Sequence, residues 1–347
     1  MVHQPPRLPH LRSLPQAVRP KQCDPSRAPQ AVRPKQCAPS SAPQAVRLFD
    51  TQVLPDAFRH VLRIPAIDKG YFTVQQQAIP EALQSLDQKM QGRLELAWKV
   101  ACQAAEVTRG FFRSDRFQIE RKNDRTPVTT ADRQAELTAR KMITGAFPAD
   151  GILGEEYGEQ PGQSEYRWII DPIDGTKSFI CGVPLYSTLL GLMRRDEPVA
   201  GIIAIPVLQE AAFGVHGGGC WYVEGNSPWK QARVSSVSQL REGLFVSSQI
   251  DSFERRGAHQ AYQRLQATAS ITRTWGDGYG YLLVATGRAE AMVDPIVSPW
   301  DVAAIEPVVV EAGGRCTSWS GPFNLHAGEL VGTNGQVHQE VLQLLSS

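Results

Sequence analysis

The chain has 347 residues, of which 42% are hydrophobic and 20% are charged, and its formal net charge is +1. This composition is typical of a soluble globular protein with one large core or two smaller ones. A charge balance near zero lacks the basic excess of nucleic-acid-binding domains, and no apolar run approaches the roughly 18 residues that a membrane span requires. We therefore expect a protein that binds neither nucleic acid nor membrane.

The cysteines contain no CxxC pair and lack the spacing to histidine that zinc fingers require. We expect reduced thiols in a cytoplasmic protein. One of them falls within an apolar helical pattern and is expected in the core. The six are Cys23, Cys37, Cys102, Cys181, Cys220 and Cys316.

The N-terminal segment is a short repeat, because residues 15–28 recur almost unchanged at 29–42 and a third copy begins at 43. It is rich in proline and poor in large apolar side chains, so burial cannot offset the entropy of ordering it. We expect residues 1–47 to be disordered. Their basic, acid-poor composition suits either an organelle transit peptide or a dispensable tail, and no secretory signal is evident.

The folded body is expected at residues 86–347, after an extension at 48–85 that carries no familiar motif. Apolar residues at helical spacing predict a long amphipathic helix over 86–112, and a second helix is predicted over 133–147. Apolar runs then predict strands at 151–154, 167–171, 185–194, 198–206, 211–216 and 219–223. Helices are expected at 254–267, 278–287, 301–313 and 336–345. Alternating strands and helices favour a layered α/β sandwich.

Two carboxylates, Asp171 and Asp174, follow the apolar strand at 167–171 and are three residues apart in a Pro/Gly turn, with Thr176 two residues later. Carboxylates this close repel each other unless a cation lies between them. A loop that leads from a strand into a helix also presents N–H groups that suit phosphate. The segment therefore indicates a metal-dependent phosphate site, although Asp-Pro and Asp-Gly are also common turn formers.

Two further segments place acids next to apolar elements. Glu155 follows a short apolar run, and Asp301 stands at the start of an apolar helix, where either residue alone could be an ordinary surface or helix-capping charge. All these candidates are oxygen donors and no histidine lies within the motifs, which favours Mg²⁺ over zinc.

Together, four segments resemble the inositol monophosphatase family of metal-dependent phosphatases. They are Asp124–Asp132 (DRTPVTTAD), Gly154-Glu155-Glu156, Asp171–Thr176 (DPIDGT) and Trp300-Asp301, and they occur in the family's order within about residues 90–340. The resemblance implies an αβαβα sandwich with the metal site between its two halves. It also implies two or three Mg²⁺ ions, a small phosphorylated metabolite as substrate, and a homodimer.

The family pattern implies a role for each matching residue. Glu155, Asp171 and the carbonyl of Ile173 would hold the first metal, while Asp171, Asp174 and Asp301 would hold the second, and Asp132 would assist a third. Glu155 and Thr176 would orient and activate the attacking water. The N–H groups of Gly175 and Thr176 would face the phosphate, and Lys122 lies where related enzymes often carry a lysine. Because no covalent nucleophile is evident, direct in-line attack by water is expected.

Substrate choice is expected to depend on residues 274–288. Asp277, followed by Tyr279 and Tyr281, together with Asp294, resembles the histidinol-phosphate phosphatase branch, which serves histidine biosynthesis. A carboxylate such as Asp277 can pair with the cationic amine of histidinol phosphate, and Tyr279 can stack or hydrogen-bond. Asp294 occupies the family's acidic substrate position.

Other interpretations remain open for these residues. Asp277 could instead cap the helix that follows it, and the tyrosines could belong to the core. Alternative functions are an inositol-1-monophosphatase or another sugar-phosphate or nucleotide phosphatase. A non-catalytic scaffold for RNA or protein is a further alternative, although every expected metal-ligand position is filled.

Overall fold

The computed structural model describes residues 77–84, 88–114, 118–121 and 127–346. The predictions for residues 1–76, and for Lys122 and Asp124, lie outside this described part of the chain. The extension at 48–85 contributes one short described helix, α2 (Glu81–Gln84).

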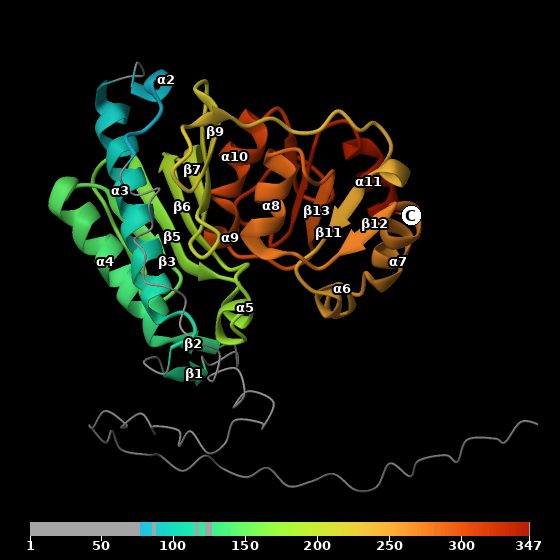
Figure 1. Cartoon of the computed structure of the whole chain (residues 1–347), viewed down its shortest axis with the longest axis horizontal. Helices are drawn as coiled ribbons and strands as arrows, with labels where there is room; N and C mark the ends of the chain where they lie inside the picture. Colours follow the sequence, from blue (N-terminus) through green and yellow to red (C-terminus); the bar gives the residue numbers. More distant parts are fainter. Residues whose placement is uncertain (1–76, 85–87, 115–117, 122–126, 347) are drawn as a thin grey trace, which may run out of the picture. The chain divides into compact units, whose positions relative to one another are not determined.

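Five layers of helices and sheets build the body (Figure 1). Helices α3 (Gln88–Phe111) and α4 (Thr130–Ala146) cover one face of an eight-stranded sheet. A central helical layer separates this sheet from a five-stranded sheet, whose outer face carries a third helical layer. The central layer holds α8 (Asp277–Ala285), α9 (Pro299–Val302) and α10 (Ile305–Glu311), and the outer layer holds α6 (Ile250–Arg255), α7 (His259–Thr268) and α11 (His338–Ser346). The expected αβαβα sandwich is confirmed.

The eight-stranded sheet has the order β10-β9-β8-β7-β6-β5-β3-β4 and is antiparallel except where β3 pairs with β5. Its strands are β3 (Gly151–Gly154), β4 (Gly158–Gln160), β5 (Tyr166–Asp174), β6 (Ser187–Arg194), β7 (Glu197–Ile205), β8 (Glu210–Val215), β9 (Gly219–Glu224) and β10 (Lys230–Gln231). Helices cover both faces of its middle strands, and this explains why these strands are apolar at nearly every position. Leu190, for example, packs in the core beneath α3, whereas its neighbour Leu189 packs against the central layer.

The five-stranded sheet has the order β12-β11-β13-β15-β14. Its strands are β11 (Leu244–Val246), β12 (Ile271–Arg273), β13 (Ala291–Asp294), β14 (Arg315–Thr317) and β15 (Leu330–Thr333). A separate two-stranded sheet joins β1 (Ile119–Arg121) to β2 (Pro127–Thr129), which leads directly into α4. The strands predicted from sequence at 151–223 are confirmed, but the sequence predicted none of the five strands of the smaller sheet.

Two predicted helices are each divided in the structure. The helix expected at 254–267 is interrupted after Arg255 because Gly257 has a φ of +74°, a left-handed conformation that ends α6 before α7 begins. The helix expected at 301–313 consists of α9 and α10, with Ala303 and Ala304 between them. Among the described cysteines, Cys102, Cys181, Cys220 and Cys316 are free thiols, and Cys102 is buried as expected. None of the described helices combines the length and apolar character needed to span a membrane.

A row of three glycines brings the central helices close to the large sheet. Gly191 on β6 pairs with Gly201 on β7, which pairs in turn with Gly214 on β8. A Cβ atom at Gly201 would lie 2.0 Å from the carbonyl oxygen of Ala304, and one at Gly214 would lie 2.4 Å from that of Pro307. The row is therefore a groove that accepts the backbone between α9 and α10 and the first turn of α10, and this contact holds the chain that follows Asp301 against the sheet.

Replacing Gly201 with valine should lower the free energy of unfolding by about 3 kcal/mol or more, because the side chain meets backbone atoms that cannot rotate away. Urea unfolding measures the change. Gly145→Ala, at an exposed position near the end of α4, is the matched control: its Cβ meets nothing within 4 Å, so stability should stay equal or rise by up to about 1 kcal/mol. A Gly201→Val protein with the wild-type unfolding midpoint would show that the groove is not needed.

Candidate active site

Three carboxylates from two elements meet at the end of β5. Asp171 and Asp174 come from the strand and Asp301 from α9, and each offers an oxygen such that all three atoms lie within 4.8 Å of one another. In a regular strand, side chains three residues apart point to opposite faces. The pairing of β5 with β6 shifts register between Asp171 and Asp174, and this irregularity allows both carboxylates to face the same point.

Hydrogen bonds fix the two acids of β5. The Asp171 Oδ1 atom accepts from the backbone N–H of Ile173 at 3.0 Å. The Asp174 Oδ2 atom accepts from the Ser187 hydroxyl and from the Gly278 N–H, both at 2.5 Å. Since Ser187 starts β6 and Gly278 lies in the first turn of α8, three elements hold Asp174 in one orientation.

Helix starts hold the other two predicted metal-binding aspartates. Asp301 accepts from the Ser298 N–H at 2.7 Å in a capping box at the start of α9. Asp132 accepts from the N–H (2.8 Å) and the hydroxyl (2.5 Å) of Thr129 through Oδ2. Its other oxygen, Oδ1, is buried and finds no hydrogen-bond partner among the described residues. A buried acceptor without a donor fits a site that a cation completes.

Crowding and burial make the charged state of this cluster costly. Burial raises the pKa of Asp171 and Asp174 well above the usual range, and the charges of neighbouring acids raise both further. Burial likewise raises the pKa of Asp301 to about 7 and that of Asp132 to about 6. A divalent cation would offset this repulsion, and the all-oxygen donor set is the kind that hard cations prefer.

The turn after β3 brings Glu155 to the cluster. Its N–H donates to the carbonyl of Ile170 at 3.2 Å, so it stands beside the start of the aspartate motif. The charge of Glu155 raises the pKa of Asp171, Asp301 and Asp132, which shows that it belongs to the same group of acids.

Sequence reasoning missed the residue that shapes this turn. Glu136 on α4 is fully buried and accepts from the N–H groups of Glu156 at 2.7 Å and Tyr157 at 3.2 Å. Arg140 pairs with it at 2.7 Å. A Cβ atom at Gly154 would lie 2.0 Å from Glu136 Oε1, so glycine is needed where this carboxylate contacts the strand. No motif marks Glu136, because a glutamate at this helical position is an ordinary feature.

The backbone turns sharply between β5 and α5 (Thr176–Ile180). Gly175 has a φ of +83°, which glycine adopts without strain, and the Thr176 hydroxyl donates to the Ile173 carbonyl at 3.2 Å. We call Gly175 and Thr176 the phosphate loop, after the role predicted for their N–H groups. Both residues are half-buried and adjoin Asp174.

The two acids predicted to bind substrate are Asp277, which lies beside this loop, and Asp294, which is linked to Asp277 through Ser248. Asp277 is half-buried, and its Oδ2 atom lies 2.6 Å from the position that a Cβ on Gly175 would take. Asp294, at the end of β13, is 5% exposed and accepts from the Ser248 N–H and the Tyr281 hydroxyl, both at 3.1 Å. Burial raises the pKa of both carboxyls, that of Asp294 to about 7.

The structure tests two of the alternative interpretations of this segment, the helix cap at Asp277 and the core position of the tyrosines. Gly276 is the N-cap of α8, so Asp277 is the first residue inside the helix and the helix-cap interpretation of Asp277 is wrong. Asp277 instead has a φ of +54°, unusual for a non-glycine residue. Tyr281 is a core residue at 1% exposure, whereas Tyr279 is partly buried.

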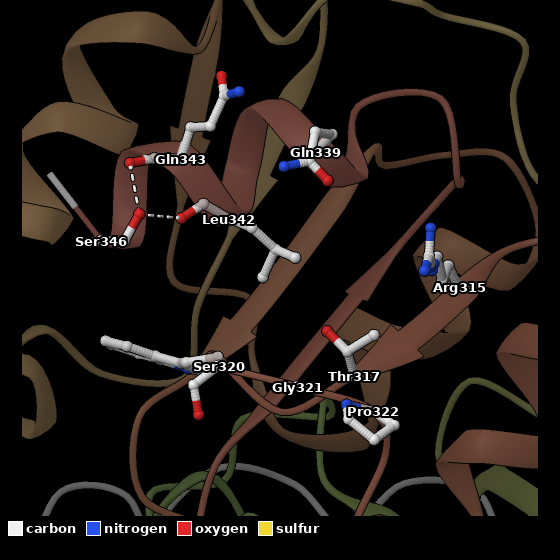
Figure 2. Close-up of a pocket in the computed structure, with 10 residues that line it drawn as sticks. Arg315, Thr317, Ser320, Gly321, Pro322, Gln339, Leu342, Gln343 and Ser346 are labelled. Atoms are coloured by element: carbon white, nitrogen blue, oxygen red, sulfur yellow. Dashed lines mark hydrogen bonds between the residues drawn. The ribbon is translucent and has the colours of Figure 1, made fainter.

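Two cavities lie apart from these acids. One, of about 460 Å³, is lined by Arg315 and Thr317 of β14 and by Gln339, Leu342, Gln343 and Ser346 of α11 (Figure 2). The other, of about 650 Å³, is lined in part by Arg167, Arg195 and His326. None of the predicted site residues lines either cavity, so neither is the predicted catalytic centre.

Comparison with known proteins relates this chain to one family of phosphatases. The sequence model of the inositol monophosphatase family matches residues 89–347. The histidinol-phosphatase of Mycobacterium tuberculosis is 39% identical over 255 residues, which cover 73% of this chain and 98% of that protein. The histidinol-phosphatase of Chlorobaculum parvum is 38% identical over 255 residues, which cover 73% of this chain and 96% of that protein.

A solved structure supports the same relationship. An inositol monophosphatase from Zymomonas mobilis superposes with a TM-score of 0.65 and 29% identity, covering 75% of this chain and 100% of the other. The family match, the relatives and the shared fold agree with the acidic cluster at the end of β5. The chain therefore belongs to the inositol monophosphatase family and is a phosphatase, in a family whose members depend on metal ions.

Proposed function

We propose that this protein is an Mg²⁺-dependent histidinol-phosphate phosphatase, which converts L-histidinol phosphate and water to L-histidinol and phosphate. The observation that carries the proposal is the carboxylate of Asp277 beside the phosphate loop. Two histidinol-phosphatases support it, because they are 39% and 38% identical to this chain. The inositol monophosphatase of known structure is less similar, at 29% identity.

The chemistry of the substrate suits this arrangement. In L-histidinol phosphate the ester oxygen is bonded to a methylene, and the next carbon carries an ammonium group. A carboxylate that pairs with this ammonium would therefore have to lie close to the bound phosphate, and Asp277 lies beside Gly175 of the phosphate loop. Inositol 1-phosphate carries only neutral hydroxyls near the ester, which can donate hydrogen bonds to a carboxylate but cannot balance its negative charge.

The metal ligands would be the residues that the family pattern assigns. Glu155, Asp171, the Ile173 carbonyl, Asp174 and Asp301 would hold two Mg²⁺ ions, and Asp132 would assist a third. Bound Mg²⁺ supplies neutralisation of the phosphate and a lower pKa for water. The roles of these side chains rest on their convergence and on their oxygen chemistry.

The chain's own residues would carry out the remaining steps. The N–H groups of Gly175 and Thr176 would bind phosphate oxygens and orient the ester. Glu155 and the Thr176 hydroxyl would orient the attacking water, and Glu155 would accept its proton. Asp277 would hold the leaving group through the ammonium, so that water attacks phosphorus in line with the ester oxygen. The bond from phosphorus to the ester oxygen would break as the new bond forms, and the ester oxygen would take a proton from solvent water to give L-histidinol. No covalent intermediate is required.

Phosphate release tests the proposal. With Mg²⁺ present, kcat/KM for L-histidinol phosphate should exceed that for inositol 1-phosphate by about 100-fold or more, because a site built around a charged partner discriminates against an analogue that lacks it. A preference for inositol 1-phosphate would overturn the proposed substrate while leaving the family assignment intact.

A further inference from the structure

Ser248 connects the two acids that lie beside the phosphate loop. Its hydroxyl accepts from the backbone N–H of Asp277 at 2.8 Å, and its own N–H donates to Asp294 Oδ1 at 3.1 Å. Ser248 follows β11, Asp277 starts α8 and Asp294 ends β13, so one residue joins three elements of the second half of the fold.

Close packing fixes the position of Ser248. A Cβ atom at Gly276 would lie 2.0 Å from the Ser248 Cα and 2.6 Å from its hydroxyl oxygen. Only glycine at 276 permits this approach, and the approach places the Ser248 hydroxyl against the N–H of Asp277. The seryl side chain is therefore part of what holds Asp277 in its left-handed conformation.

The first turn of α8 also contacts a predicted metal ligand. The residue after Asp277, Gly278, donates its N–H to Asp174, and Tyr281 one turn later donates its hydroxyl to Asp294. The start of α8 thus connects a predicted metal ligand to both acids. A shift of this helix start would move Asp277 relative to the phosphate loop.

The acid pair has little positive charge near it among the described residues. Lys177 is the cation whose charge acts on Asp277, but it is exposed and its Nζ donates to Gln249 at 2.5 Å. The Ser248 N–H donates to Asp294, and this bond partly offsets the burial of that carboxyl. Two acids held together in this way, Asp294 buried and Asp277 half-buried, favour a ligand that brings its own positive charge.

We propose that Ser248 is a positioning residue that holds Asp277 and Asp294 as a paired anionic surface for the cationic leaving group of the substrate. Asp277, beside the phosphate loop, receives the ammonium on the carbon next to the ester methylene. Asp294, held by Ser248 and Tyr281, adds negative charge to the same surface. This inference rests on the proposed function, since it concerns recognition of a cationic phosphate ester.

Ser248→Ala tests the inference with two substrates. The probes are L-histidinol phosphate and p-nitrophenyl phosphate, which carries no cation. The ratio of their kcat/KM values should fall about tenfold, mainly through a higher KM for L-histidinol phosphate. Alanine keeps the backbone N–H that binds Asp294, but the N–H of Asp277 loses its acceptor and the Asp277 carboxylate loses its alignment. An equal loss on both substrates, or an unchanged ratio, would overturn the positioning role.

Ser247→Ala is the matched control. Ser247 is the neighbouring residue. It is fully buried, whereas Ser248 is half-buried, and its hydroxyl has no hydrogen-bond partner within the described part of the chain. Its removal should leave the substrate ratio within about twofold of wild type. If Ser248→Ala does not fold, Ser248→Cys decides the question, since it keeps the side-chain size and weakens the hydrogen bonds.

The experiment separates this inference from the proposed function. A wild-type protein that does not prefer L-histidinol phosphate over inositol 1-phosphate would refute the function. Phosphoethanolamine, a minimal ester with an ammonium on the second carbon, then tests Ser248 against p-nitrophenyl phosphate. If wild type prefers phosphoethanolamine and Ser248→Ala loses that preference about tenfold, the positioning role stands; without such a loss it fails.

Discussion

Replacing Asp174 with asparagine should lower kcat for phosphate ester hydrolysis by about 1000-fold or more, equal to about 4 kcal/mol of transition-state stabilisation. Asparagine keeps the size of the side chain, and its carbonyl oxygen can still accept from Ser187 and Gly278. What it loses is the negative charge that faces Asp171 and Asp301. Steady-state phosphate release measures the effect, and circular dichroism checks that the variant is folded.

A buried acid elsewhere supplies the control. Asp150 accepts two hydrogen bonds from Arg93, both at 2.8 Å, and others from Ser164 and Trp168. Asp150→Asn should lower the free energy of unfolding by about 3 kcal/mol, because the two bonds from Arg93 lose the buried negative charge that they face. The kcat of the folded variant should stay near that of wild type. Near-normal kcat in Asp174→Asn would refute the metal assignment of that residue.

Removing divalent metal with a chelator should abolish activity. In the metal-free protein, the free energy of unfolding should fall as pH rises from about 4 to about 7. In the folded, metal-free protein the carboxyl of Asp301 has a pKa of about 7 and that of Asp132 a pKa of about 6, both raised mainly by burial. An unfolded aspartate titrates near about 4. Between these values the native state binds more protons than the unfolded state, so the free energy of unfolding decreases with rising pH.

Mg²⁺ should reverse this loss. A cation bound only by the folded protein stabilises it by about 2.7 kcal/mol at 100 times its dissociation constant, and it keeps the carboxylates ionised. Urea unfolding at pH 5, 6, 7 and 8, with chelator or with Mg²⁺, measures the difference. His338, whose pKa burial lowers to about 4, acts with the opposite sign in both series and cancels from that difference. A stabilisation by Mg²⁺ that does not grow with pH would contradict the cluster.

The first half of the fold could be predicted from sequence because its elements carry strong periodic signals. Helices α3 and α4 are 24 and 17 residues long, so their apolar faces recur over several turns. Strands β6 and β7 are buried on both faces and read as long apolar runs. The smaller sheet lacked such a signal, because β11, β12 and β14 have three residues each and no alternation is visible over that length.

The amino-acid sequence alone determined the phosphate chemistry, since Asp171, Asp174, Glu155 and Asp301 are recognisable as a set of oxygen donors at characteristic spacings. Only the tertiary structure decided how these acids are oriented and what surrounds them. Ser187, Glu136 and Ser248 are ordinary polar residues in the sequence, and they matter because the strands, helices and glycine contacts bring them to the carboxylates. Hydrogen bonds act over about 3 Å in space, whereas residues such as Ser248 and Asp294 are far apart along the chain, so local sequence patterns do not reveal them.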